Sequence, residues 1–365
     1  MNKKVIAQTP VMKQFLDVKE RYEDTLVLFR MGDFYETFLD DAEITAKILG
    51  IVLTKRANGK AADVPLAGFP YHALDNYLPK LVKAGYRVAI CEQVEDPKLA
   101  KGIVKREVVE VVTPGTITTD QALSKKTNHY IAALTIQKGQ AGFAVLDSST
   151  GEFHIGECPS DKVLDYLLKF SPSEVLLSEN TVYSTTDWYR ELRPFVTQIE
   201  DWTFDYDQSH RTLVQHFKIK SLKGFGCDNL MLGITAAGAL MQHVKTNLSL
   251  PLNHLSKISP VFEEGIMGLD GFTIRNLEVF KSLSTQGTHG TLLDCLDQTQ
   301  SSGGGRLFRR WLHNPLTDIN RLNDRLDTVD AFTKNSRILK STRLSLQKVV
   351  DVERILGRVN QAKAT

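Results

Sequence analysis

Hydrophobic positions divide the first 116 residues into alternating helices and strands. Apolar residues recur at helical spacing in three segments, and Gly50 is placed to end the second of them. The expected helices are 8–24, 36–49 and 72–84. Short runs of β-branched residues between them predict strands at 25–29, 51–54, 87–93 and 107–112, and 57–60 predicts an exposed turn. The pattern favours an α/β domain over residues 1–116.

A second α/β domain is expected over residues 129–250, after a linker at 117–128 that has few large apolar residues. Its first three strands form a meander divided by turn residues. They are expected at Tyr130–Gln137, Gly142–Asp147 and Glu152–Ile155. A helix at 160–170, a strand at Glu174–Ser178 and a later helix at 229–246 follow. A meander followed by alternating helices and strands favours a ribonuclease-H-like domain.

Residues 251–365 are predicted to be almost entirely helical. The expected helices are 270–284, 290–297, 304–313, 318–335 and 337–358, and the serine- and glycine-rich stretch 301–305 is expected to separate two of them. The last helix has no obvious partner to complete a core. We therefore expect the chain to be a piece of a longer protein, and 251–365 to be the start of an all-helical domain.

Charge is nearly balanced overall, with a formal net charge of +2 on 365 residues. Its distribution is uneven, because residues 301–345 hold nine Lys or Arg against four Asp. A shorter basic stretch comprises Lys98, Lys101, Lys105 and Arg106. Solvated helix faces and phosphate binding both fit these stretches. The four cysteines lie far apart, which fits buried, reduced thiols and does not suggest a metal site.

Phe34 and Glu36 are the candidate functional residues in the first domain. In an extended segment, residues two apart project from the same side, so the ring and the carboxylate would lie together with Tyr35 turned inward. Helical spacing with Phe38 favours a different interpretation, in which Phe34 packs in the core. Glu36 could equally be a solvated carboxylate near a helix N-terminus, and Asp33 could cap the following helix.

A series of motifs resembles the bacterial MutS family of DNA mismatch-recognition proteins. The motifs occur in the family's order over nearly the whole chain, which makes the resemblance specific. They are FRMGDFYE at 29–36, LTKR at 53–56, PLAGFPYHA at 65–73, AICEQV at 89–94, VTPGT at 112–116, LDSSTGE at 146–152, RWLHNPL at 310–316 and DVERIL at 351–356. The resemblance implies a mismatch-binding domain, a connector domain and the start of a helical lever or core domain.

The resemblance also implies roles for individual residues. Phe34 would wedge into the minor groove at a mismatch, and Glu36 would hydrogen-bond the displaced base. Weaker assignments, as contacts to the DNA backbone, fall on Lys55, Arg56, Lys105 and Arg106. The implied partners are mismatched double-stranded DNA, a MutL-type protein and a second copy of the chain. The implied location is the bacterial cytosol at the nucleoid, without a membrane.

The family's ATPase lies beyond the segments that these motifs cover. No GxxxxGK[ST] phosphate loop occurs in the 365 residues, and SSGGGR at 301–306 lacks the Lys-Ser/Thr pair. We therefore expect no enzymatic activity and no cofactor here, with ATP and magnesium belonging to the C-terminal domain. Two alternatives remain open. One is a metal-dependent nuclease using Asp147, and the other is a module that docks a MutL-type partner without binding DNA.

Overall fold

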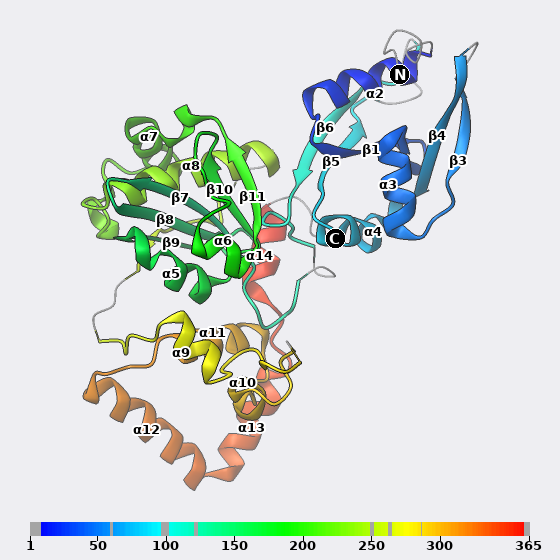
Figure 1. Cartoon of the computed structure of the whole chain (residues 1–365). Helices are drawn as coiled ribbons and strands as arrows, with labels where there is room; N and C mark the ends of the chain where they lie inside the picture. The colour runs from blue at the N-terminus through cyan, green and yellow to red at the C-terminus, as the bar shows by residue number, and fades with distance from the viewer. Residues whose placement is uncertain are drawn as a thin grey trace. The chain divides into compact units, whose positions relative to one another are not determined.

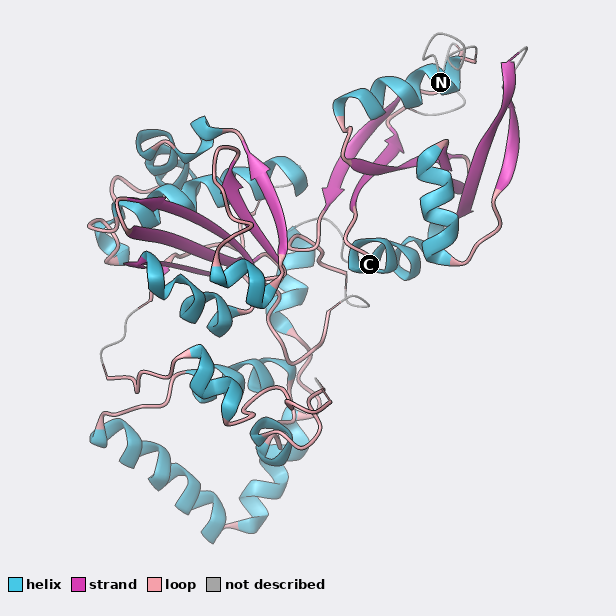
Figure 2. Ribbon diagram, viewed as in Figure 1, coloured by secondary structure: helices cyan, strands magenta, loops and turns pink. Residues whose placement is uncertain are grey.

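The computed structural model describes residues 9–58, 61–95, 102–119, 123–248, 252–261, 265–285 and 287–360. The chain divides into two units. Unit 1 comprises Met1–Ala122 with His243–Leu250, and unit 2 comprises Leu123–Gln242 with Pro251–Thr365. Figures 1 and 2 show the helices and strands of each unit.

Unit 1 is built on a six-stranded sheet in the order β3-β4-β2-β1-β5-β6. Only the pair of β1 and β5 is parallel among these neighbours. The strands are β1 (Thr25–Met31), β2 (Phe34–Phe38), β3 (Thr54–Asn58), β4 (Ala61–Pro70), β5 (Arg87–Gln93) and β6 (Arg106–Val112). The helices are α2 (Pro10–Arg21), α3 (Asp40–Leu49) and α4 (Leu74–Lys83).

Side chains alternate between the two faces of this sheet, so each face has its own helical cover. Phe15 of α2 packs edge-to-face against Phe29 and Phe38 on one face. On the other face, Ala42 and Ala46 of α3 pack against Ala67 of β4. Both clusters are buried, and they fix the sheet that carries the candidate site.

Two predictions near the candidate site need correction. The expected helix at 36–49 is a strand up to Phe38 followed by a helix from Asp40, because β2 pairs with both β1 and β4. Leu39, at a φ of 56°, marks the break. The strand expected at 51–54 instead begins at Thr54. The turn expected at 57–60 lies partly outside the described residues, and Gly50 ends α3 with a φ of 67°, as predicted.

Unit 2 contains a second six-stranded sheet in the order β11-β10-β7-β8-β9-β12. β7, β8 and β9 form the predicted antiparallel meander, while β10 and β11 continue in parallel from β7. The strands are β7 (Ile131–Gln137), β8 (Gln140–Asp147), β9 (Glu152–Pro159), β10 (Glu174–Ser178), β11 (Phe195–Ile199) and β12 (Ser259–Pro260). The helices are α5 (Val163–Phe170), α6 (Asp187–Leu192), α7 (Tyr206–Phe217) and α8 (Met231–Leu248), of which the part up to Gln242 belongs to unit 2.

The remainder of unit 2 is mainly helical, as predicted, although several boundaries differ. Its helices are α9 (Gly271–Asn276), α10 (Leu292–Leu296), α11 (Ser302–His313), α12 (Ile319–Lys334), α13 (Ser336–Leu346) and α14 (Val352–Asn360). The helix expected at 270–284 ends at Asn276, and the one expected at 337–358 is divided into α13 and α14. The expected separator 301–305 is instead the N-cap and first turn of α11. Cys295 is exposed, against the expectation of buried thiols.

Two arginines from the helical part hold the segment that precedes β7. The Arg306 guanidinium donates to the carbonyl of Lys125 at 2.9 Å. Arg354 donates to the carbonyls of Ser124 and Thr127 at 2.9 and 2.7 Å. We call this arrangement the arginine clasp. It joins residues 124–127 to α11 and α14 within unit 2.

Candidate nucleic-acid interface

Strand β2 presents Phe34 and Glu36 on the same side of the unit 1 sheet. Phe34 is 46% exposed, whereas Tyr35 between them is 2% exposed. The predicted arrangement of ring and carboxylate, with Tyr35 turned inward, is therefore confirmed. The alternative that Phe34 is a core residue is wrong, because Phe34 is the first residue of β2 and is 46% exposed.

The turn that leads into Phe34 is held from both sides. Gly32 has a φ of 57°, a conformation that glycine adopts without steric cost. The Arg30 side chain donates to the carbonyl of Gly32, and the backbone N–H of Tyr71 donates to the carbonyl of Asp33 at 2.8 Å. Asp33 is therefore a turn residue, and the prediction that it caps the next helix is wrong, since Leu39 occupies that N-cap.

A cluster under this turn was not predicted from the sequence. The Arg30 guanidinium stacks on the ring of Tyr71, 3.9 Å from its centroid. The Tyr35 hydroxyl donates to the Glu92 carboxylate. Burial, together with Glu92, raises the pKa of Tyr35 well above its ordinary value, so the hydroxyl remains a donor. FRMGDFYE and PLAGFPYHA contain three of these residues, but neither motif indicates that they meet.

Glu36 is paired with Arg56 across the sheet. Arg56 Nη1 donates to Glu36 Oε2 at 2.6 Å, and the two side chains are 36% and 20% exposed. Burial raises the pKa of Glu36, while Arg56 and, more weakly, Arg106 oppose that rise. Arg56, predicted as a contact to the DNA backbone, thus has a protein partner in the structure.

The other predicted backbone contacts differ in accessibility. Lys55 is exposed on β3. Lys105 is 66% exposed and pairs with Glu107 at 2.6 Å, a surface ion pair of little energetic weight. Arg106 is only 9% exposed. Its guanidinium donates to the carbonyls of Arg30 and Val104, at 2.6 and 2.8 Å, so its placement gives a phosphate contact no support. Lys98 and Lys101 lie outside the described residues.

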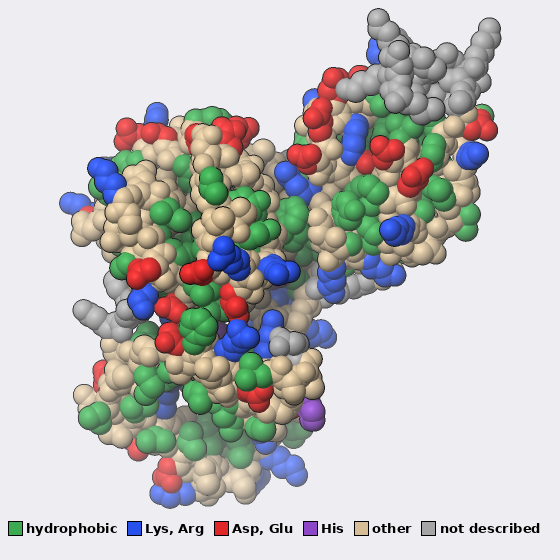
Figure 3. All heavy atoms as spheres, in the orientation of Figure 1, with side chains coloured by type: hydrophobic (Ala, Val, Ile, Leu, Met, Phe, Trp, Pro, Cys, Tyr) green, Lys and Arg blue, Asp and Glu red, His purple; other side chains and the backbone are tan. Residues whose placement is uncertain are grey.

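The basic stretch 301–345 does not form one free basic surface. The Arg306 side chain is 1% exposed and bonds both oxygens of Asp351 at 2.7 and 2.8 Å, so it is a structural residue. Arg310 pairs with Glu152 at 3.1 Å, and Lys334 pairs with Asp330. On the face drawn in Figure 3, acidic and basic side chains are interspersed. The solvated or paired interpretation fits these residues better than phosphate binding.

Asp147 does not form the centre expected of a metal-dependent nuclease. Its side chain is buried, and it accepts hydrogen bonds from Ser149 N and Ser149 Oγ at 2.9 and 2.6 Å. The other oxygen accepts from Asn128 Nδ2 and His129 N. Among the described residues, no group of three or more His, Cys, Asp or Glu side chains could hold a metal ion. Asp147 shapes the turn between β8 and β9 instead.

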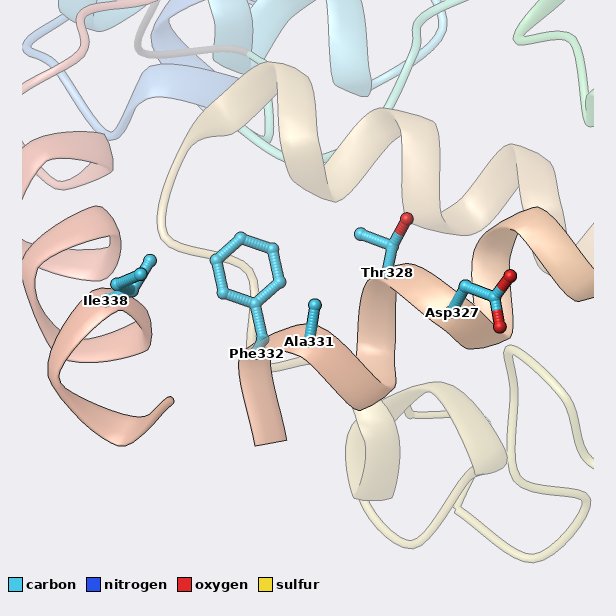
Figure 4. A pocket seen from close by; sticks show the side chains of 5 residues that line it. All are labelled: Asp327, Thr328, Ala331, Phe332 and Ile338. Atoms are coloured by element: carbon cyan, nitrogen blue, oxygen red, sulfur yellow. The ribbon is translucent and has the colours of Figure 1, made fainter. Parts of the chain in front are cut away.

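An open hollow lies between α12 and α13 (Figure 4). It is lined by Asp327, Thr328, Ala331, Phe332 and Ile338. The lining is mostly apolar and includes no basic side chain, so it offers nothing for a phosphate. Among the residues that the structure describes, none of the helices combines the length and apolar character that crossing a bilayer requires.

Comparison with known families covers nearly the whole chain. MutS domain I matches residues 9–121, MutS domain II matches 129–256 and MutS domain III matches 272–365. The chain belongs to the MutS family. The candidate residues on β2, β3 and β6 all lie within the segment matched by MutS domain I.

Individual MutS proteins match nearly the whole chain. A DNA mismatch repair protein MutS from Salinibacter ruber is 43% identical over 98% of this chain. The MutS proteins of Flavobacterium johnsoniae and Chlorobaculum parvum are 42% and 41% identical over 99% and 98% of it. The chain spans about 40% of the length of these relatives. These matches therefore span the segments in which the motifs were identified.

Proposed function

We propose that this chain recognises mismatched double-stranded DNA, with Phe34 as the residue that enters the duplex. The observation that carries the proposal is an exposed phenylalanine at the end of a strand, on a turn held by Arg30 and Tyr71, beside a carboxylate. A turn whose backbone is held in this way can present the ring to DNA with little loss of backbone freedom on binding. The relatives are DNA mismatch repair proteins, which supports the same function.

The preference for mismatched over fully paired DNA would come from the weaker pairing and stacking of the mismatched base pair. Unstacking a base costs a few kcal/mol, and the cost is least where pairing is already poor. Stacking on an aromatic side chain returns about 1–3 kcal/mol. Insertion of Phe34 is thus favourable only at weakened steps. Such indirect readout suits a protein that detects many different mismatches.

Glu36 would supply a hydrogen bond to the displaced base. A carboxylate near phosphates is repelled, which opposes binding to intact duplex. At a mismatch, a hydrogen bond between the displaced base and the Glu36 carboxyl offsets this repulsion. A fully paired duplex offers no such hydrogen bond. Lys55 and Lys105, both exposed, are the best-placed contacts to the DNA backbone. We propose no phosphate contact for Arg106.

The finer assignments for the rest of the chain are also proposals. The strand order β11-β10-β7-β8-β9, with a leading antiparallel meander, supports a ribonuclease-H-like connector over 129–250. Boundaries at 1–116, 117–128 and 251–365 follow from the same domain scheme. We place ATP hydrolysis and magnesium in another part of the protein, since the sequence here has no phosphate loop. Dimerisation and docking of a MutL-type partner are proposed for the complete protein.

The test compares mismatched and fully paired duplexes of the same length. In the complete protein, Phe34→Ala is expected to lower the ratio of the two affinities by about 5- to 150-fold, equivalent to ~1–3 kcal/mol of stacking. Glu36→Ala should lower the ratio by raising affinity for paired duplex. Phe272→Ala is the matched control, because Phe272 is also exposed, at 55%, and lies outside the site.

An unchanged ratio for Phe34→Ala would overturn the proposal. The alternative of a partner-docking module makes a different prediction, namely no salt-dependent binding to either duplex. Absence of binding at low salt, with MutL-type docking retained, would favour that alternative.

A further inference from the structure

The ion pair between Arg56 and Glu36 connects two strands that are not neighbours. Arg56 lies on β3 and Glu36 on β2, with β4 between them. The Arg56 side chain therefore crosses the sheet to reach the carboxylate, and its guanidinium passes 5.9 Å from the centroid of the Phe38 ring. Gly68, which pairs with Glu36 in β4, contributes no side chain along this path.

Arg56 competes directly with a base for the Glu36 carboxylate. It occupies Oε2 at 2.6 Å, so a base donor that uses this oxygen must displace the guanidinium. The basic groups that face Glu36 are Arg56 from β3 and Arg106 from β6. Arg106 acts only through its charge, since its guanidinium is bonded to Arg30 and Val104. Arg56, in contrast, is 36% exposed, so its side chain already borders solvent.

We propose that Arg56 is a specificity-determining positioning residue, which holds Glu36 in the free protein and transfers to a DNA phosphate when Glu36 bonds a displaced base. This inference rests on the proposed function and adds a partner exchange to it. On a paired duplex no base is available for Glu36, so the ion pair remains closed. On a mismatched duplex the new base and phosphate contacts replace the ion pair. The exchange therefore occurs on one class of DNA only.

Proton uptake accompanies the exchange. Burial already raises the pKa of Glu36 and Arg56 opposes the rise, so departure of Arg56 raises it further. Glu36 then binds a proton more readily in the mismatch complex than in the free protein. Mismatch affinity is expected to increase as pH falls through the pKa of Glu36 in the complex and to level off below its pKa in the free protein. Affinity for paired duplex should not show this pH dependence, because the ion pair between Arg56 and Glu36 stays closed on paired DNA.

The experiment measures duplex affinity as a function of salt and pH for Arg56→Gln, Arg56→Lys and Lys55→Gln in the complete protein. Affinity falls with salt, and each lost phosphate contact reduces the steepness of that fall, the salt slope of log affinity against log salt, by about 0.9. Arg56→Gln is expected to lower this slope on mismatched DNA and leave it unchanged on paired DNA. Lys55→Gln should lower it on both duplexes, because Lys55 is exposed and forms no ion pair with any residue that the structure describes.

Two further measurements distinguish a partner exchange by Arg56 from a purely structural role of Arg56. Arg56→Gln should reduce the preference for mismatched DNA at least fivefold and raise the pH below which mismatch affinity stops increasing, because only the pKa of Glu36 in the free protein changes. Arg56→Lys keeps the charge, so it should retain the wild-type salt slope, and it serves as the test if Arg56→Gln does not fold. If Phe34→Ala abolishes mismatch preference while Arg56→Gln matches wild type in slope and ratio, the exchange is wrong. If Phe34→Ala has no effect, the proposed function itself is wrong.

Discussion

Gly68 shows how one missing side chain shapes the candidate site. A Cβ built at this position would lie 2.8 Å from the carbonyl oxygen of Tyr35 and 3.4 Å from Cγ of Glu36. The first distance is too short for two atoms that the sheet holds in register. Glycine at this position therefore allows β4 to lie close to β2, and it keeps the space beside Glu36 open.

Replacing Gly68 by alanine should destabilise unit 1. Gly68→Ala forces β4 away from β2, and overpacking of this kind costs about 1–3 kcal/mol. We expect a lower free energy of unfolding for the transition that reports on unit 1, measured by urea titration. Gly224→Ala is the control, because a Cβ there meets nothing within 4 Å. Equal stability of the two variants would contradict the steric explanation.

At this scale the sequence predicted the residues but not their partners. Alternation in an extended segment placed Phe34 and Glu36 together, which the structure confirms. The pair of Glu36 with Arg56, 20 residues away, depends on the register of β3, β4 and β2. A single sequence contains no signal for that register. The exposure of Phe34 could not be predicted either. Phe34 and Phe38 lie four residues apart, which is also the spacing of two residues on one buried face of a helix.

Helix α11 is an element whose start was misread because of its glycines. Ser301 caps it by accepting from Gly304 N at 3.2 Å, and three glycines then occupy the first turn. Glycine is a poor helix former, so the composition alone predicts a loop. Packing explains one of these residues, since a Cβ on Gly305 would lie 2.5 Å from Cγ of Lys126.

Alanine should therefore have opposite effects at two positions of this turn. Gly303→Ala meets nothing closer than 3.9 Å, so it should raise stability by about 0.4–1 kcal/mol through the lower entropy of the unfolded chain. Gly305→Ala pushes against the Lys126 stem and should lower stability instead. Thermal unfolding of both variants measures the difference. A stabilising Gly305→Ala would show that Lys126 moves aside without cost.

Elements with a strong periodic pattern were predicted well, and those decided by tertiary contacts were not. Strands β5 and β10 match their expected bounds because both contain short apolar runs between turn residues. The continuous helix expected at 337–358 fails because residues 347–351 leave the helix, and Asp351 in that gap binds Arg306. This contact joins residues 45 apart, beyond any local pattern.

On the scale of the whole molecule, an ion pair joins the β7–β12 sheet to the helical part of unit 2. Arg310 of α11 lies 3.1 Å from Glu152 of β9, and the Tyr130 hydroxyl donates to the same carboxylate at 2.7 Å. Burial alone would raise the pKa of Glu152. The hydrogen bonds and charges of His154, Arg310 and Tyr130 lower it to about 2.

Unit 2 should therefore lose stability in acid through Glu152. A carboxyl whose pKa is lower in the folded state stabilises the fold above its unfolded value of 4.5 and stops doing so as pH falls to about 2. The difference in unfolding free energy between wild type and Glu152→Gln should be largest at neutral pH and vanish near pH 2. Arg310→Met should reduce that difference. A difference independent of pH would contradict this role.

Domain order was predictable from the sequence, whereas the contacts between segments were not. Changes of periodicity and the MutS motifs indicated three successive regions, and family models match three MutS domains in that order. Arg306 illustrates the contacts between segments that the sequence did not predict. It looked like one of many exposed basic residues, but its guanidinium is enclosed by Asp351, Glu353 and a backbone carbonyl. Only the folded chain brings these groups together.

The arginine clasp has a consequence for folding during synthesis. Its two hydrogen-bonding arginines follow the segment that they hold by 181 and about 230 residues. A ribosome adds about 5–20 residues per second, so residues 124–127 wait about 10–50 s for Arg354 to be made. Domains generally fold as units with the N-terminal one first, which gives the sheet that carries Phe34 time to form beforehand. Closure of the clasp thus belongs among the last steps of assembly of unit 2.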